Sequence, residues 1–217
     1  MKSDLTELVF ILDRSGSMAG LESDTIGGYN ALLAKQKKDA GEAVVTTVLF
    51  DDNYELLHDR INVRGVAPIT EQEYFVRGST ALLDAIGKTI SKIGNAQKQT
   101  SEDLRAGKVI FVITTDGMEN ASCEYSSARV KQLIEKQKAK YGWEFIFLGA
   151  NIDAIATAER FGIDASRAAN YRPDSKGTRL NYEVVSNAVS DFRAGAPISK
   201  SWKKSIDEDF EHREGEK

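Results

Sequence analysis

The stretch Val9-Phe10-Ile11-Leu12-Asp13-Arg14-Ser15-Gly16-Ser17-Met18 decides the fold of this chain. Its first half is a continuous apolar run, typical of a strand covered on both faces. The strand ends at Asp13, and Ser15 and Ser17 follow at alternate positions, so an extended loop can turn three oxygen-bearing side chains to one side. Gly16 permits a tight bend between the serines. Taken alone, such residues are also typical of strand-end turns and caps.

Three further apolar runs bounded by turn residues repeat this pattern, at Val44–Phe50, Val109–Ile113 and Phe145–Leu148. Between them, apolar residues recur every three or four positions, as in a helix with one buried face, from Ala81 to Ile93 and from Val130 to Ile134. The second of these helices has Ser126 or Ser127 as a plausible N-cap. The alternation predicts an α/β fold: a doubly wound, mostly parallel central sheet in a Rossmann-like three-layer arrangement.

The segment Tyr54–Val63 follows the Val44–Phe50 strand after only three residues, Asp51-Asp52-Asn53. A parallel crossover needs about a dozen residues, so we expect an antiparallel hairpin at the edge of the sheet. Asp51-Asp52 and, near the C-terminus, Asp207-Glu208-Asp209 are interpreted as turn residues or part of a solvated face.

The C-terminal third shows weaker patterns. They predict a short helix from Asp153 to Phe161, a last strand near Ala168–Tyr171 and a helix over Leu180–Phe192. We expect a single domain over residues 1–198. For residues 199–217 a charged tail and a short docked helix remain equally open, since three apolar residues recur there every four positions: Trp202, Ile206 and Phe210.

The composition of the chain argues against several classes of partner and location. The 217 residues carry a net charge of −4 with scattered Lys and Arg, which argues against nucleic acid and anionic membranes as partners. The apolar runs are far shorter than the ~20 residues that cross a bilayer. A single cysteine, Cys123, and a start without an export pattern lead us to expect a cytoplasmic protein.

Two later segments use the same chemistry as the first loop. Gly78-Ser79-Thr80 precedes a helix, and Thr114-Thr115-Asp116-Gly117 ends a strand. Because the carboxyl ends of parallel strands share one rim of the sheet, five oxygen donors are expected to converge there. Carboxylate and hydroxyl oxygens suit Mg²⁺ first, with Mn²⁺ or Ca²⁺ possible, and leave a coordination position open for an acidic group. The predicted metal ligands are Asp13, Ser15, Ser17, Thr80 and Asp116.

Together the three motifs resemble the von Willebrand factor A (VWA) domain with an intact metal-ion-dependent adhesion site (MIDAS), over about Leu5 to Phe192. The resemblance implies that Ser15, Ser17 and Thr80 ligate the ion directly, while Asp13 and Asp116 bind it directly or through water. It also implies that a Glu or Asp of a partner protein completes the coordination shell. The likeness is to small intracellular bacterial members, which often work beside AAA-type ATPases or in stress-response systems.

Three functions stay open at this stage. The first is a metal-dependent protein-binding module without enzymatic activity. The second is a structural subunit that the metal merely stiffens. The third is a Mg²⁺-dependent phosphoryl-transfer enzyme with Asp13 as nucleophile. Against the third, Ser15 stands where phosphatases of the haloacid dehalogenase type need a second aspartate.

Neighbouring residues receive provisional roles. We expect four of them to ring the ion and shape partner choice: Met18, Met118, Glu119 and Asn120. Arg14 either attracts an acidic partner or is structurally paired. Asn151 and Asp153 either extend the site or form a turn and helix cap. Cys123 is expected to be inert, and His58 and His212 show no catalytic partner.

Overall fold

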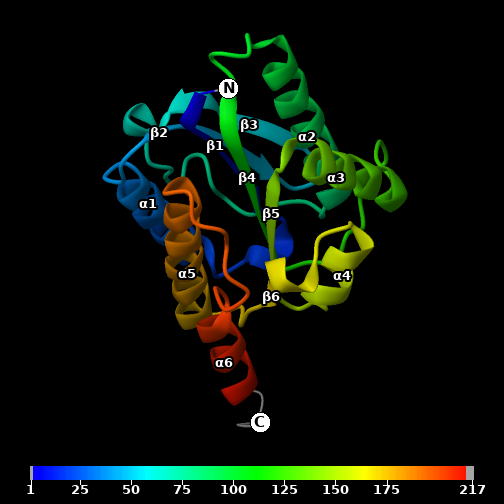
Figure 1. Cartoon of the computed structure of the whole chain (residues 1–217). Helices are drawn as coiled ribbons and strands as arrows, with labels where there is room; N and C mark the ends of the chain where they lie inside the picture. Colours follow the sequence, from blue (N-terminus) through cyan, green and yellow to red (C-terminus); the bar gives the residue numbers. More distant parts are fainter. Residues whose placement is uncertain (1, 214–217) are drawn as a thin grey trace.

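A central sheet of six strands, in the order β3-β2-β1-β4-β5-β6, lies between two layers of helices (Figure 1). The structure is a computed structural model that describes residues 2–213. The strands are β1 (Lys2–Asp13), β2 (Glu42–Phe50), β3 (Tyr54–Asn62), β4 (Ala106–Thr115), β5 (Glu144–Gly149) and β6 (Ala168–Asn170).

All neighbouring strands pair in parallel except β2 and β3, which form an antiparallel hairpin. The sequence prediction of a doubly wound α/β sheet with one antiparallel edge strand is therefore confirmed. The hairpin ladder is irregular around Thr47. Arg60 adopts a left-handed backbone with φ of 51° in the same hairpin.

The helices divide between the two faces of the sheet. One face carries α1 (Glu22–Gln36), α5 (Ser175–Arg193) and α6 (Lys204–His212), and the other carries α2 (Leu82–Gln99), α3 (Ser127–Tyr141) and α4 (Ala154–Arg160). Three short 3₁₀ turns complete the chain: η1 (Gly16–Met18), η2 (Val63–Gly65) and η3 (Ala165–Arg167).

Alternation along β1 explains why its apolar run is unbroken. Phe10 and Leu12 belong to the core beneath α1 and α5, whereas Val9 and Ile11 belong to the core beneath α2 and α3. All four side chains are at most 1% exposed, so both faces of the central strand exclude water.

Polar side chains mark where several helices begin. The Ser126 hydroxyl accepts a hydrogen bond from the Arg129 backbone amide at the start of α3. Asp153 caps α4 in the same way. These contacts satisfy amides that have no partner within the helix, so the predicted helix starts at these two positions are confirmed.

The sequence patterns did not predict α1. Its buried face includes the polar residues Asp24, Thr25 and Gln36, and Gly27-Gly28 interrupts its apolar positions. Tertiary packing against α5 stabilises this helix: a methyl group on Gly28 would lie 2.4 Å from the Tyr182 ring, so the two helices are in close contact there.

The segment after α5 returns to the sheet. Trp202 Nε1 donates a hydrogen bond to the Ser166 carbonyl at 2.7 Å, and Lys203 Nζ donates to the Ala168 carbonyl at 2.6 Å. Ile206 of α6 is 2% exposed. The boundary at residue 198 stays a prediction, and residues 214–217 lie outside the described part. Within residues 2–213 no helix combines the length and apolar character needed to cross a membrane.

Candidate metal centre

The predicted ligands lie where the two central strands end. β1 stops at Asp13 and its parallel neighbour β4 stops at Thr115, with Leu12 opposite Thr114 in the ladder. Asp116 therefore emerges beside Asp13. Thr80 approaches the same rim because it lies just before α2.

The three hydroxyls meet at one point. Ser15 Oγ lies 3.1 Å from Ser17 Oγ, and Thr80 Oγ1 donates a hydrogen bond to Ser15 Oγ at 3.0 Å. A methyl group on Gly117 would come within 2.8 Å of Ser17 Oγ and 3.0 Å of Thr80 Oγ1. A larger residue at position 117 would therefore intrude into the space that the hydroxyls share.

Asp13 is held firmly in this group. Its Oδ1 accepts from the Ser15 backbone amide at 2.7 Å, and its Oδ2 accepts from Thr115 Oγ1 at 2.5 Å. Tyr74 OH donates to the Asp13 carbonyl at 2.5 Å. Burial raises the pKa of Asp13 to about 6, and the nearby charge of Asp116 adds to this rise.

Asp116 is the least satisfied residue of the group. It is 1% exposed, and among the described residues neither carboxylate oxygen has a hydrogen-bond partner of good geometry. Burial raises its pKa, although the nearby Ser17 hydroxyl acts in the opposite direction. A buried carboxylate without a partner is costly unless a cation compensates it, so this donor set fits a metal ion.

The chemistry of the donors indicates which ions fit. The group contains two carboxylates and three neutral hydroxyls, and within residues 2–213 no cluster of three or more His, Cys, Asp or Glu side chains could hold a metal. Hard oxygen donors of this kind favour Mg²⁺, Mn²⁺ or Ca²⁺. Ser17 is exposed, which leaves an approach from solvent.

The sequence patterns did not predict two residues that position Asp13. These residues are Thr115 and Tyr74. Thr115 stands beside Asp116 in the quoted motif, where a buried hydroxyl next to a carboxylate is a usable signal. Tyr74 lies in the long segment between η2 and α2, and nothing in its neighbourhood marks it.

Glu119 and Asn120, which were expected to ring the ion, bind backbone amides with their side chains. Glu119 Oε2 accepts from the Leu83 amide at 2.8 Å, at the start of α2. Asn120 Oδ1 accepts from the Thr80 amide at 2.9 Å. Because both side chains accept hydrogen bonds from backbone amides at or just after Thr80, they hold the segment that carries Thr80 in place.

A reciprocal contact fastens the same two loops. Asp84, in the first turn of α2, accepts from the Cys123 amide at 3.0 Å and from the Tyr125 amide at 2.7 Å. These hydrogen bonds lower the pKa of Asp84 against the opposing effect of burial. The segments that carry Thr80 and Asp116 are thus tied together from both sides.

The two methionines near the rim differ. Met18 is 1% exposed and packs in the core, so the expectation that it rings the ion was wrong. The turn of η1 directs the Met18 side chain away from the rim and into the hydrophobic core. Met118 is 73% exposed and lies directly after Gly117, where a partner could contact it.

Arg14 is structurally paired. Its side chain has no exposed surface, and it forms ion pairs with Asp51 at 2.9 Å and Glu55 at 2.7 Å. Asp51, interpreted from sequence as a turn or solvated residue, is fully buried and also pairs with Arg77 at 2.8 Å. The solvated-face alternative is wrong because Asp51 is buried and its charge is neutralised inside the protein. The turn alternative is confirmed, since the Asn53 backbone amide donates a hydrogen bond to Asp51 Oδ1 at 2.7 Å.

The other provisional residues have local roles. Asp153 caps α4, and Asn151 adopts a left-handed backbone with φ of 54°, so the turn-and-cap interpretation accounts for both. His58 is buried with Nδ1 2.9 Å from Thr47 Oγ1. Cys123 is a free, exposed thiol.

Asp209 in α6 is also more enclosed than expected. Its side chain is 10% exposed and lies 2.7 Å from Lys176 Nζ of α5. The solvated face predicted over Asp207–Asp209 therefore applies to exposed Glu208 but not to Asp209.

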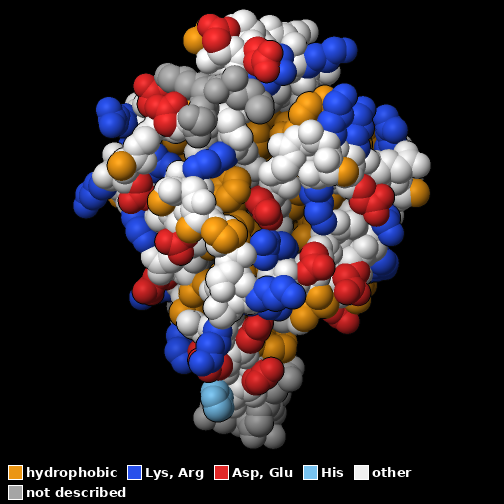
Figure 2. Space-filling view, viewed as in Figure 1, with side chains coloured by type: hydrophobic (Ala, Val, Ile, Leu, Met, Phe, Trp, Pro, Cys, Tyr) orange, Lys and Arg blue, Asp and Glu red, His pale blue; other side chains and the backbone are white. Residues whose placement is uncertain are grey.

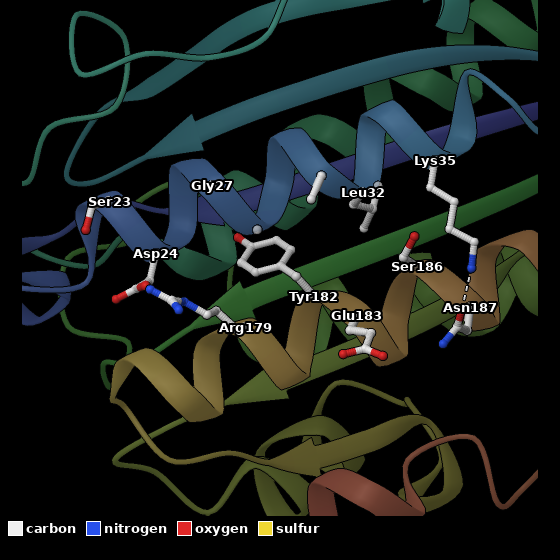
Figure 3. A pocket seen from close by; sticks show the side chains of 12 residues that line it. Ser23, Asp24, Gly27, Leu32, Lys35, Arg179, Tyr182, Glu183, Ser186 and Asn187 are labelled. Atoms are coloured by element: carbon white, nitrogen blue, oxygen red, sulfur yellow. Dashed lines mark hydrogen bonds and ion pairs between the residues drawn. The ribbon is translucent and has the colours of Figure 1, made fainter.

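A cavity of about 690 Å³ lies elsewhere, in the groove between α1 and α5 (Figure 3). Three of its four charged residues are already engaged: Asp24 pairs with Arg179 at 3.0 Å, and Lys35 donates a hydrogen bond to Asn187. None of the five predicted ligands lines it. The groove is a helix–helix seam in which the Tyr182 ring points toward α1 (Figure 3).

No protein-family model matches the chain, and no curated protein matches it. Solved structures are similar to it. Proximal thread matrix protein 1 from the mussel byssus, with a zinc-occupied MIDAS motif, has 14% identity and a TM-score of 0.59 over 87% of this chain and 46% of that one. A von Willebrand factor type A structure from Catenulispora acidiphila has 13% identity and a TM-score of 0.60 over 87% and 43%.

Manganese-loaded TRAP protein from Plasmodium vivax has 17% identity and a TM-score of 0.58 over 82% of this chain and 72% of that one. The chain thus spans less than half the length of the mussel and Catenulispora proteins. At these identities the likeness establishes architecture alone: the chain has the VWA fold.

Proposed function

We propose that this protein is a divalent-metal-dependent protein-binding module with a MIDAS-type site, which captures a Glu or Asp side chain of a partner protein. The observation that carries the proposal is Asp116, a buried carboxylate without a hydrogen-bond partner among residues 2–213, which stands beside three converging hydroxyls and Asp13. Similar folds with a zinc-occupied MIDAS motif or bound manganese support a metal at this position.

Each residue then has a distinct role. Ser15, Ser17 and Thr80 supply neutral oxygens, while Asp13 and Asp116 supply the two negative charges that balance a divalent ion. Mg²⁺ is the proposed ion, with Mn²⁺ or Ca²⁺ as alternatives. Because the hydroxyls add no charge, the ion keeps enough attraction for one more carboxylate from outside.

The partner would approach from the exposed side of the rim. Ser17 and Met118 face solvent, whereas the other four predicted ligands are buried. Met118 offers apolar contact next to the ion, which suits a partner whose acidic residue is flanked by apolar groups. By analogy, an AAA-type ATPase or a stress-response system in the cytoplasm would supply such a partner.

We propose that the module is not an enzyme. In a phosphoryl transfer by Asp13, one carboxylate oxygen must attack the phosphorus. Both Asp13 oxygens accept hydrogen bonds, from the Ser15 amide and from Thr115, which hold the carboxylate for positioning. A purely structural role for the metal is the remaining alternative.

Two measurements test the proposal. Mn²⁺ binding, followed by electron paramagnetic resonance, should show one site in the wild type and an affinity at least about tenfold weaker in Thr80→Val, which removes one hydroxyl. Ser79→Ala is the matched control, because Ser79 is exposed and adjacent. Equal Mn²⁺ affinity in Thr80→Val and wild type would refute the site.

Partner capture is tested separately. Affinity purification from native lysate in Mg²⁺ should retain a protein that is lost in EDTA and with Asp13→Ala. If metal removal lowers the melting temperature but leaves the same partner bound, the structural alternative holds and the capture proposal fails.

A further inference from the structure

A second hollow opens at the end of the sheet opposite the metal centre. It has a volume of about 500 Å³ and lies where α2 and α3 end and where β4 begins. Ala106 and Gly107, the first residues of β4, form part of its wall. The volume is within the range of pockets that bind ligands.

The rim of this hollow is strongly basic. Among the residues that line it are four cationic side chains and no Asp or Glu: Lys98, Arg105, Lys136 and Lys140. The whole chain has a net charge of −4, so positive charge is concentrated here against the overall balance. Figure 2 shows Lys and Arg side chains beside hydrophobic ones on the upper part of the molecule, where these elements end.

The three lysines are exposed, and no ion pair holds any of them among the described residues. Lysines near helix ends also complement the helix dipole. The dipole effect requires a positive charge in the last turn of a helix only. Lys136 lies further inside α3 and still lines the hollow, so the helix dipole does not account for its position.

The floor of the hollow is apolar. Trp143, Val109 and Ile90 line it and are at most 5% exposed. Tyr141 stands at its edge and is 50% exposed. A floor of this kind accepts an apolar side chain, while the rim attracts negative charge.

Polar atoms in the lining also lack partners. Gln97 Oε1, Gln137 Oε1 and Arg105 Nε are buried without a hydrogen-bond partner in the described residues. Gln97 Nε2 donates to Glu7, which fixes the orientation of that amide. A bound polypeptide carries both N–H and C=O groups and could satisfy these atoms after small side-chain rotations.

We propose that this basic hollow is a second docking site, which binds an acidic segment of a partner protein with one apolar residue seated on the Trp143 floor. Charge complementarity with the four cations selects the acidic segment. Duplex nucleic acid is a poorer match. Its phosphates bind broad basic surfaces, and it offers no apolar side chain to contact the floor of the hollow.

The experiment uses the whole chain and a fluorescently labelled short peptide in which Glu and Asp surround a central Trp. Fluorescence anisotropy should show saturable binding that is unchanged by EDTA and by Asp13→Ala. The double variant Lys136→Glu/Lys140→Glu should weaken binding at least about tenfold, since both charges are reversed at the rim. Tyr141→Ser should weaken it by a smaller factor.

The matched control is Lys38→Glu/Lys200→Glu, which changes the net charge equally at exposed lysines outside the hollow. The proposal is overturned if the peptide does not bind, if both double variants bind equally well or equally badly, or if EDTA abolishes binding. It is also overturned if a duplex oligonucleotide or an anionic vesicle displaces the peptide more effectively than unlabelled peptide does. Asp13→Ala changes the candidate metal centre and leaves the basic hollow intact. The docking proposal can therefore fail independently of the proposed metal-dependent function.

Discussion

Arg14 and Asp51 form an ion pair that is completely enclosed by protein, with Nε 2.9 Å from Oδ2 and no exposed surface on either side chain. The pair ties the loop that carries Asp13, Ser15 and Ser17 to the end of β2. Backbone bonds strengthen this tie, because the Arg14 amide donates to the Phe50 carbonyl at 2.8 Å and the Arg77 amide donates to the Arg14 carbonyl at 2.9 Å.

Replacing Arg14 by Met should therefore destabilise the protein strongly. Asp51 would keep only the half-exposed Arg77 as an ionic partner, and losing one member of a buried pair costs about 3–5 kcal/mol. Urea denaturation measures the change in the free energy of unfolding. The double variant Arg14→Met/Asp51→Leu should recover part of the loss, and a loss below about 1 kcal/mol in the single variant would contradict the structural role.

Asp116→Asn should separate stability from metal binding. Without metal, the substitution removes one of two repelling buried carboxylates, so the free energy of unfolding should rise by about 1 kcal/mol. With MgCl₂, the wild type should gain thermal stability and the variant should not. Thermal unfolding with and without MgCl₂ measures both effects, and a full Mg²⁺ response in Asp116→Asn would exclude this residue from the site.

Gly28→Ala should destabilise the seam between α1 and α5. The added methyl would lie 2.4 Å from the Tyr182 ring, and overpacking of this kind costs about 1–3 kcal/mol. Gly27→Ala is the control, because the space around it is open, and there the helix should gain up to about 1 kcal/mol. Denaturant midpoints that move in the same direction for both variants would show that the close contact does not matter.

Glu7 predicts a specific dependence of stability on pH. Its side chain is buried and pairs with Arg60 Nε at 2.8 Å, yet burial outweighs this pair and raises the pKa of Glu7 above its ordinary value of 4.5. The folded state therefore binds this proton more tightly than the unfolded state does. The associated stability is complete below pH 4.5 and is lost as the pH rises through the folded pKa.

Glu7→Gln cannot titrate at this position. The free energy of unfolding of the wild type, minus that of Glu7→Gln, should thus decrease as the pH rises from below 4.5. Urea denaturation of both proteins across this range gives the difference directly. A constant difference would show that Glu7 has the same pKa folded and unfolded.

Sequence patterns predicted the sheet well because buried parallel strands are continuous apolar runs. The hairpin followed from the length of one connection, since three residues cannot make a crossover. Helix α1 escaped notice because Asp24, Thr25 and Gln36 occupy its buried face. Their burial depends on contacts with α5, about 150 residues later, which no local pattern encodes.

The candidate metal centre shows the same contrast between what local sequence patterns predict and what depends on tertiary contacts. Motif spacing placed five oxygen donors together, and the structure brings Asp13, Ser15, Ser17, Thr80 and Asp116 to one rim. Their assignment as metal ligands stays a prediction. Side-chain direction around them did not follow from spacing: Met18 turns inward within η1, and Glu119 turns to amides of α2. Such directions depend on tertiary contacts formed by residues distant in sequence.

The length of β4 sets a requirement for any partner that uses both proposed sites. The strand has 10 residues, so it separates the basic hollow from the metal rim by about 30 Å. A single polypeptide that engages both ends needs at least about nine extended residues between its two acidic segments, and more to pass around the helices. With a shorter linker only one segment binds at a time, and the gain in avidity from an intramolecular second contact disappears.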